Sequence, residues 1–373
     1  MLLRIGFMAF CTKKLYFNER GVKMMKKGCK FFALLTSAAI LASLGGCGGG
    51  TKADASSSAP SAATSGAASS EASKTAVNYP TKPIQIICPV KAGGDTDRNT
   101  RVLATALQKY LDTPVVVTNV DGGATVMGMQ QCLDAAPDGY TLVVNGTDMF
   151  VPFMMGSTDI SIDSFKTVGI PLVDNSTVLA VNKNSGYTDL KDLVEKSKAA
   201  PDSIEYGGKI GATNQICGVA MNSVWESKFK FVDVGNNAAK MTALLAEQTD
   251  VVNISYSLAK DYFSSGEFVP LVLLGAEKNE LLPEVPMASD MGYENVDFSK
   301  FFWVGTHPDT PDEVVDILAD ALEKASKDPD FVANMEANYL TATFMSKQAA
   351  ADYANKFYED TMLPYKDAFL AAQ

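Results

Sequence analysis

Glycines, threonines and short acidic side chains gather where an apolar, strand-like run gives way to a helical pattern. The clearest case is the stretch 84–111, in which an apolar run is followed by a glycine-rich turn at 92–94 and then by apolar residues at spacings of three and four. We predict a strand, a turn and a helix that begins near Thr96 or Asp97, either of which can serve as the N-cap. The free N–H groups of the first helical turn would form a site for an anion.

The same arrangement recurs further along the chain. The predicted strand Tyr140–Asn145 ends at the polar tip 145–148 (NGTD), and the turns 207–214 (GGKIGATN) and 235–239 (GNNAA) each separate a predicted strand from a predicted helix. Such alternation is typical of open, mainly parallel α/β sheets, which bind ligands beyond the carboxyl ends of their strands. Two sheets of this kind facing each other would form a ligand cleft. The alternative stays open that some of these glycines only serve turns that need a positive φ.

Few residues of this sequence could support catalysis or bind a metal ion. His307 is the one histidine, it lies in a predicted loop, and no G-x-S-x-G, C-x-x-C or H-E-x-x-H motif occurs. We expect no catalytic residue, no metal site and no cofactor.

The length and the net charge of the chain limit the number of domains and the kinds of partner that we expect. The 373 residues leave room for two domains, and the formal net charge is −11. The first 46 residues carry eight Lys and Arg against one acid, so the remainder has 24 basic and 42 acidic residues, a formal charge of −18. Nucleic acid is therefore not an expected partner. An anionic ligand would have to be held by local N–H groups and not by the overall field.

The N-terminal part reads as a leader and a tether. Residues 24–46 combine a basic start with an apolar run too short to span a membrane, and they end in Gly-Gly before Cys47, a pattern that resembles a bacterial lipobox. We predict a lipoprotein signal peptide at 24–46, an upstream extension at 1–23 that is an artefact of the assigned start, and a lipidated Cys47 followed by a flexible Ser/Ala-rich tether to residue 78. The alternative is an ordinary secreted protein that is cleaved elsewhere.

Two further sets of residues are expected inside the folded body. Cys88, Cys132 and Cys217 stand among apolar or small residues, so we predict buried thiols and not disulfides. The predicted helical tail 349–372 carries aromatic residues that we expect to face the core: Tyr353, Phe357, Tyr358, Tyr365 and Phe369.

Several motifs taken together resemble the extracytoplasmic solute-binding proteins of tripartite tricarboxylate transporters. The family's opening K-P-I and V-P-x-x-A-G-G-x-T-D are similar to residues 82–84 and 89–97, and its A-A-P-D-G-Y-T-L stands at 135–142. The motifs P-V-V-V-x-N, A-L-L-x-G-x-V-D, L-P-D-V-P and A-G-Y are matched, wholly or in part, by Pro114–Asn119, Ala243–Asp250, Leu282–Pro286 and Met291–Tyr293.

This resemblance implies an α/β, two-domain periplasmic-binding fold (type II-like) with a hinge of two crossing strands, expected near 178–181 and 301–305. One domain would comprise 79–178 plus 304–373, and the other 179–303. The protein would be a lipoprotein on the outer face of a bacterial cell membrane. It would capture a small carboxylate between its domains, without catalysis, and deliver it to the membrane permease subunits of the transporter.

The resemblance also implies a ligand site built from the turns described above. Carried over position by position, it comprises Ala92, Gly93, Thr96, Asp97, Gly146, Thr147, Gly211, Ala212, Thr213, Asn214, Gly235 and Asn236. The chain departs from the family at Asp95, where a third glycine is usual, and at Lys91, where a small or apolar residue is usual. Lys91 would offset Asp95 or bind a carboxylate itself, so we add it to the predicted ligand residues; a plain surface lysine is the alternative.

Two other functions share some of these features. A receptor that senses a solute for a signalling partner would have the same fold and ligand site. An extracytoplasmic α/β enzyme would need a general base, and the chain has no recognisable constellation for one.

Overall fold

The computed structural model describes residues 77–372. The predicted upstream extension, the signal peptide, Cys47 and the tether up to residue 76 lie outside the described residues. Within 77–372, no helix is both long and apolar enough to cross a membrane.

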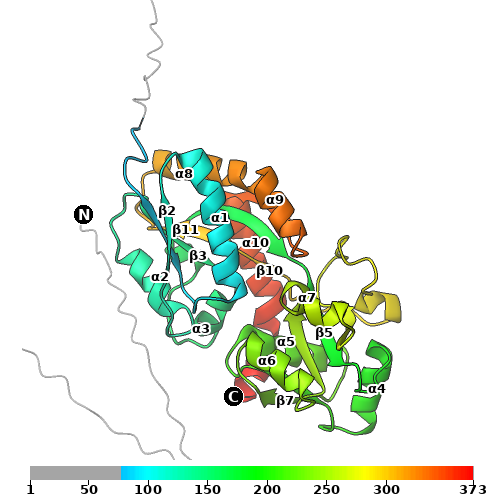
Figure 1. Cartoon of the computed structure of the whole chain (residues 1–373). Helices are drawn as coiled ribbons and strands as arrows, with labels where there is room; N and C mark the ends of the chain where they lie inside the picture. Colours follow the sequence, from blue (N-terminus) through cyan, green and yellow to red (C-terminus); the bar gives the residue numbers. More distant parts are fainter. Residues whose placement is uncertain (1–76, 373) are drawn as a thin grey trace, which may run out of the picture. The chain divides into compact units, whose positions relative to one another are not determined.

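The first of two sheets lies in what we call lobe 1. Its strand order is β10-β4-β11-β3-β1-β2, with β12 paired to β4. β1 runs parallel to β2 and β3, whereas β11 is antiparallel to β3 and β4 (Figure 1). The strands are β1 Ile84–Cys88, β2 Val115–Asn119, β3 Thr141–Asn145, β4 Lys166–Asp174, β10 Lys300–Phe301, β11 Trp303–Thr306 and β12 Thr341–Ser346.

Helices cover both faces of this sheet. α1, α8 and α9 share one apolar cluster with the sheet, and α2, α3 and α10 share another. In β1, Ile84 and Ile86 face the first cluster and Ile87 the second. The helices of this lobe are α1 Asp95–Leu111, α2 Val126–Leu133, η1 Thr147–Met149, α3 Phe150–Met154, η2 Ile162–Ser164, α8 Asp312–Ser326, α9 Pro329–Glu336 and α10 Lys347–Phe357.

The second sheet lies in lobe 2 and has the order β7-β6-β8-β5-β9. β6 is parallel to β7 and β8, and β5 is antiparallel to β8 and β9. α4 and α5 pack on one face of this sheet, and α6 and α7 on the other. The elements are β5 Thr177–Asn182, α4 Leu190–Ala199, β6 Glu205–Gly208, α5 Thr213–Val224, β7 Lys230–Asp233, α6 Asn237–Leu245, β8 Val251–Ser255, α7 Tyr256–Ser264, β9 Phe268–Leu273 and η3 Ala288–Met291.

The chain passes between the sheets at two points. β4 ends in the first sheet at Asp174, and β5 begins in the second at Thr177. The chain leaves the second sheet at Leu273 and returns to the first at Lys300. The final segment then reaches lobe 2 again, since α11 (Lys366–Ala371) packs against α5 after the π-helical turn η4 (Tyr358–Met362) and η5 (Leu363–Tyr365).

Several expectations can be compared with this fold. The α/β class is confirmed, but both sheets are mixed and not mainly parallel, because β5, β10, β11 and β12 run against their neighbours. Cys88, Cys132 and Cys217 are buried and free, as predicted. The tail aromatics pack on the core, also as predicted. The division into domains at 178/179 and 303/304 stays a prediction.

Candidate functional site

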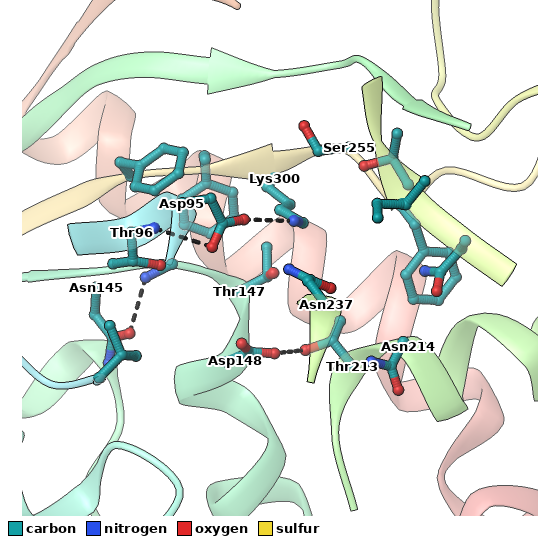
Figure 2. Close-up of a pocket in the computed structure, with 18 of the residues that line it drawn as sticks. Asp95, Thr96, Asn145, Thr147, Asp148, Thr213, Asn214, Asn237, Ser255 and Lys300 are labelled. Carbon is teal, nitrogen blue, oxygen red and sulfur yellow. Dashed lines mark hydrogen bonds and ion pairs between the residues drawn. The ribbon is translucent and has the colours of Figure 1, made fainter. Parts of the chain in front are cut away.

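A cavity of about 90 Å³ lies between the two lobes at the ends of several strands (Figure 2). One water molecule needs about 10–15 Å³ on this measure, so the cavity is large enough for a small organic molecule. Its polar lining comes from the starts of α1, η1, α5, α6 and β5, from the ends of β3 and β8, and from β10. The lining residues are Val90, Asp95, Thr96, Asn145, Gly146, Thr147, Asp148, Thr177, Thr213, Asn214, Asn237, Lys240, Asn253, Ile254, Ser255, Phe298, Lys300, Phe301 and Phe302.

Five of the predicted ligand residues line this cavity: Thr96, Gly146, Thr147, Thr213 and Asn214. The starts of α1, α5 and α6 all contribute lining residues. Because the first N–H groups of an α-helix have no partner inside the helix, these three starts bring hydrogen-bond donors to one cavity.

The predicted residues of the first turn mostly hold the turn itself. Asp97 is 5% exposed, accepts from the Gly93 N–H at 2.9 Å and from Asn119 Nδ2 at 2.9 Å, and pairs with Arg101 at 2.9 Å. Burial acts to raise the pKa of Asp97, but these hydrogen bonds outweigh it and the pKa lies below the usual value. The helix begins at Asp95 with Gly94 as N-cap, so the expectation that Thr96 or Asp97 caps it is wrong. Asp97 is committed to the turn and to Arg101.

The other predicted turn residues are also occupied within the protein. The Gly211 N–H donates to Gln215 Oε1 at 2.8 Å, and the Gly235 N–H donates to Asp233 Oδ1 at 3.1 Å. Asn236 caps α6 by accepting from the Ala239 N–H at 3.0 Å. Gly93 and Gly211 have φ of +90° and +71°, so these two turns require glycine irrespective of a ligand. Ala92, Gly93, Gly211, Ala212, Gly235 and Asn236 are not part of the cavity lining.

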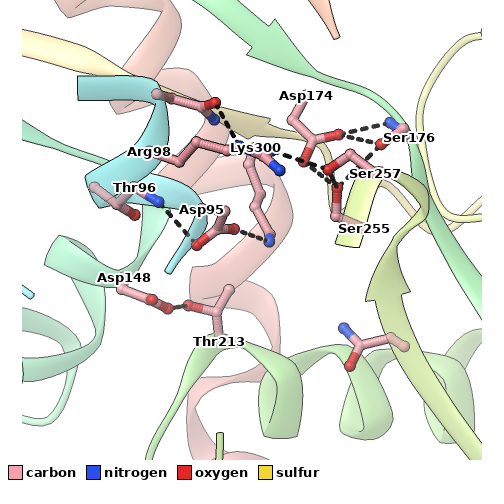
Figure 3. A network of polar contacts seen from close by, with 12 residues as sticks. Asp95, Thr96, Arg98, Asp148, Asp174, Ser176, Thr213, Ser255, Ser257 and Lys300 are labelled. Atoms are coloured by element: carbon pink, nitrogen blue, oxygen red, sulfur yellow. Dashed lines mark hydrogen bonds and ion pairs between the residues drawn. The ribbon is translucent and has the colours of Figure 1, made fainter. Parts of the chain in front are cut away.

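Lys91 lies away from the cavity. Its side chain is 84% exposed, and its ammonium is 3.8 Å from Asp121 Oδ2. The charge of Asp95 is offset instead by Lys300, whose Nζ donates to Asp95 Oδ2 at 2.7 Å (Figures 2 and 3). Burial acts to raise the pKa of Asp95, but Lys300 outweighs it and lowers that pKa below its usual value. Burial likewise acts to lower the pKa of Lys300, and Asp95 outweighs it, so that pKa is raised.

A second buried lysine, Lys240 of α6, lines the same cavity and is 2% exposed. Its Nζ donates to the Asn253 carbonyl at 2.5 Å and to Asn253 Oδ1 at 3.3 Å. Burial, and then the nearby Lys300 ammonium, lower its pKa to about 7. Sequence reasoning missed both lysines. The signal was a lysine inside an apolar run: 298–303 reads FSKFFW, and α6 reads NAAKMTALL.

Polar contacts join the lobes near the cavity (Figure 3). Thr213 at the start of α5 donates to Asp148 of η1, and Arg98 of α1 donates to Ser257 of α7 at 3.1 Å. Near the crossing from β4 to β5, the buried Asp174 accepts from Ser176 Oγ at 2.6 Å and from Ser255 Oγ at 2.7 Å. Lobe 1 and lobe 2 are therefore linked on both sides of the cavity by hydrogen bonds that a change of lobe separation would break.

Solved structures with this architecture define the class of the fold. A solute-binding protein from Polaromonas, of the family called TctC, superposes with a TM-score of 0.65 at 20% identity over 79% of this chain and 100% of its own. A Rhodopseudomonas palustris protein, MatC with bound malate, gives 0.66 at 18% identity over 78% of this chain and 100% of its own. Another R. palustris protein, with adipate, gives 0.67 at 18% identity over 79% and 98%. The fold is that of the two-lobed periplasmic solute-binding proteins.

Sequence comparison then gives the family. The model described as "Tripartite tricarboxylate transporter family receptor" matches residues 99–363, and a UPF0065 protein of Bordetella pertussis is 27% identical over 270 residues, 72% of this chain and 83% of its own. The chain belongs to the tripartite tricarboxylate transporter receptor family. This is a family of solute-binding receptors and not of enzymes. In the described residues, no group of three or more His, Cys, Asp or Glu side chains is placed to hold a metal ion.

Proposed function

We propose that this protein captures a small carboxylic acid in the cavity between its lobes and delivers it to the membrane permease subunits of a tripartite tricarboxylate-type transporter. The observation that carries the proposal is the convergence of three helix N-termini and two lysines on one small cavity. Carboxylates are favoured at helix N-termini by the free N–H groups and by the helix dipole. The malate and adipate held by two proteins of the same fold support this ligand class.

Within this proposal, Thr96, Gly146, Thr147, Thr213 and Asn214 contact the ligand. Ala92, Gly93, Asp97, Gly211, Ala212, Gly235 and Asn236 act by shaping the turns, and Lys91 has no part in binding. The moving bodies in this proposal are the predicted domains, 79–178 plus 304–373 and 179–303, with one adjustment. β10 (Lys300–Phe301) and Trp303 move with the first sheet, to which they are paired, and β5 moves with the second sheet from Thr177 onward.

Ligand binding in this scheme favours the closed arrangement of the lobes, which the permease then recognises. The Thr213–Asp148 and Arg98–Ser257 contacts belong to that closed arrangement, since each has one partner in either lobe. No covalent step is involved.

We further propose that Cys47 is acylated after cleavage of residues 24–46, so that a tether anchors the folded body to the outer face of the cell membrane. The experiment for the anchor compares the full chain with Cys47→Ala in the native type of host. The unchanged chain is expected in the membrane fraction and labelled by a palmitate analogue, and the variant unlabelled and released. Equal release of both would contradict the anchor and leave the ligand proposal standing.

A thermal-shift screen of the purified protein tests the ligand class. The panel contains dicarboxylates, tricarboxylates, aromatic acids, amino acids and neutral amides. A ligand at 100 times its Kd adds about 2.7 kcal/mol to the free energy of unfolding, which gives a clear shift. We expect the shift with a carboxylate class. A shift confined to neutral amides would contradict the proposal.

A further inference from the structure

Lys240 differs from every other charged group of the cavity in its partners. The carboxylate of Asp95 has Lys300, and Asp148 has the Thr213 hydroxyl. Lys240 has only the two oxygens of Asn253, and no carboxylate of the described residues lies within ion-pair distance of it. A buried ammonium without a counter-ion is costly, because an uncharged environment replaces its hydration shell.

Two further donors of the same cavity lack partners. Among the described residues, Asn145 Nδ2 and Thr177 Oγ1 are buried side-chain atoms without a hydrogen bond, and both residues line the cavity. Asn145 ends β3 in lobe 1 and Thr177 begins β5 in lobe 2, so the residues with unused donors line the cavity from both lobes. Buried polar groups are normally paired, so two unused hydrogen-bonding groups beside a buried lysine without a counter-ion point to an acceptor-rich occupant.

We propose that Lys240 is the counter-ion of the bound carboxylate and that this lysine takes up a proton from solution as the ligand binds. The inference rests on the proposed function, and it deepens it by assigning the ligand's charge partner and a pH dependence. The ligand carboxylate supplies the negative charge that the protein itself does not place beside Lys240. The Asn145 and Thr177 side chains complete the set of donors.

Lys240 is the group near the cavity that accounts for this pH dependence, because the neighbouring groups with shifted pKa values do not change their protonation near neutral pH. Lys300 of β10, Asp95 of α1, Asp148 of η1 and Cys217 of α5 act on it electrostatically. The pKa of Lys300 is raised and that of Asp95 is lowered, so both stay charged near neutral pH. Burial raises the pKa of the Cys217 thiol to about 12, so it stays neutral.

The sign of the effect follows from the lowered pKa of about 7 in the free protein. Above pH 7 the side chain of Lys240 is mainly neutral in the free protein. A bound anion favours the charged form, so Lys240 becomes protonated when the ligand binds. Binding is then accompanied by proton uptake, and the Kd rises with pH by up to about tenfold per unit above pH 7. Below pH 6 Lys240 is already charged in the free protein, so the proton uptake and the pH dependence of the Kd both disappear.

Isothermal titration calorimetry of the purified protein tests this, with malate, succinate, adipate and citrate as probes. Titrations at pH 8 and pH 6 in buffers of different ionisation enthalpy report the protons taken up per ligand. We expect close to one proton at pH 8 and about one tenth at pH 6 for the unchanged protein, given a pKa of about 7 and after correction for the protons that the dissolved probe itself carries at each pH. Lys240→Met should take up none, bind at least tenfold more weakly at pH 6.5, and lose the pH dependence.

The controls separate this role from a structural one. Lys191→Met, which changes an exposed lysine of α4, should match the unchanged protein in affinity and proton uptake. If the unchanged protein binds a probe without proton uptake, the proposal is overturned whether or not Lys240→Met folds, and the proposed function stands. Binding by Lys240→Met with unchanged affinity also overturns it. If none of the carboxylates binds, both the inference and the proposed function fail.

Discussion

The two walls of the cavity balance their charges in different ways. The wall from lobe 1 holds Asp95 and Asp148 and draws Lys300 from β10 to pair with Asp95. The wall from lobe 2 holds Lys240 with threonine, serine and asparagine side chains, and within the described residues it lines the cavity with no carboxylate. Lobe 1 thus pairs Asp95 with a lysine of its own wall and leaves Asp148 with the Thr213 hydroxyl, whereas the wall of lobe 2 carries a lysine and lacks an anion.

The difference shows where selectivity for an anion can come from in a protein that is acidic as a whole. A negative overall field does not attract a carboxylate, so the local arrangement has to do so. Neutralising Asp95 with Lys300 removes repulsion, and leaving Lys240 unpaired creates attraction. Both features depend on burial, because exposed charges would be screened by water and salt.

The largest effect on stability is expected from removing the lysine of the Asp95–Lys300 ion pair in lobe 1. Lys300→Met leaves Asp95 without its cation, with a side chain only 16% exposed. We expect the free energy of unfolding to fall by about 2–4 kcal/mol at pH 7, measured by urea denaturation. Because the pKa of Asp95 is lowered in the folded protein, this contribution is present above pH 3.8 and fades as the pH falls further. Asp95→Asn combined with Lys300→Met should recover most of the loss. Equal destabilisation by the single and double variants would contradict the pairing.

A somewhat smaller effect should come from the unpaired lysine of lobe 2. Between its lowered pKa of about 7 and the ordinary value of 10.5, the unfolded chain holds a proton on Lys240 that the folded chain does not. The stability of the unchanged protein therefore rises with pH in this window relative to Lys240→Met. From pH 7 to pH 9 we expect the difference to change by about 2 kcal/mol, followed by urea denaturation without ligand. Parallel pH profiles would show that Lys240 has an ordinary pKa.

A third prediction concerns a double variant that lacks one threonine hydroxyl on each wall of the cavity. Thr96→Ala together with Thr213→Ala should weaken binding of a carboxylate about tenfold, because each hydroxyl contributes about 0.5–1.5 kcal/mol, and leave the melting temperature near the original value. Calorimetric titration and a thermal melt of the same sample measure both quantities. Unchanged affinity would place the ligand away from the shared cavity.

The smallest effect is expected at Lys91. Its side chain is 84% exposed and its one ion pair, with Asp121, is long at 3.8 Å. Lys91→Ala should change the affinity for a carboxylate less than twofold. A tenfold loss would restore the sequence-based prediction that Lys91 binds the ligand, and it would mean that lobe 1 supplies the anion's partner.

The sequence was sufficient to predict the fold and the turns that form the cavity walls. It was less informative about which charged side chains line those walls. Local patterns around residues 92–97, 145–148 and 207–214 were sufficient to predict strands, turns and the approximate starts of helices, since these depend on neighbours in the chain, but they did not identify Gly94 as the N-cap of α1. Thr96, Thr147, Thr213 and Asn214, which the family resemblance placed in these turns, line the cavity. The roles of Lys240 and Lys300 were not predictable from spacing. Lys300 meets Asp95 across 205 positions of the sequence, through the return of the chain to the first sheet.

Asp97 and Lys91 show the converse, because neither of these predicted ligand residues lines the cavity. Asp97 was carried over from the family's opening motif, and Lys91 was added because its charge could offset Asp95. The side chain of Asp97 instead turns back to Gly93 and Arg101, and that of Lys91 points to solvent. A motif fixes the course of the backbone, whereas the direction of each side chain also depends on partners such as Asn119 that the motif does not contain.

The central claim is that a carboxylate, by virtue of its charge, is the ligand of the cavity between the lobes. The most direct measurement compares malate and adipate with their uncharged diamides by calorimetric titration of the purified protein at pH 7. We expect that at least one diacid binds and that its diamide, of nearly the same shape, binds at least a hundredfold more weakly. Equal binding of an acid and its diamide, or binding of the diamide alone, would contradict it.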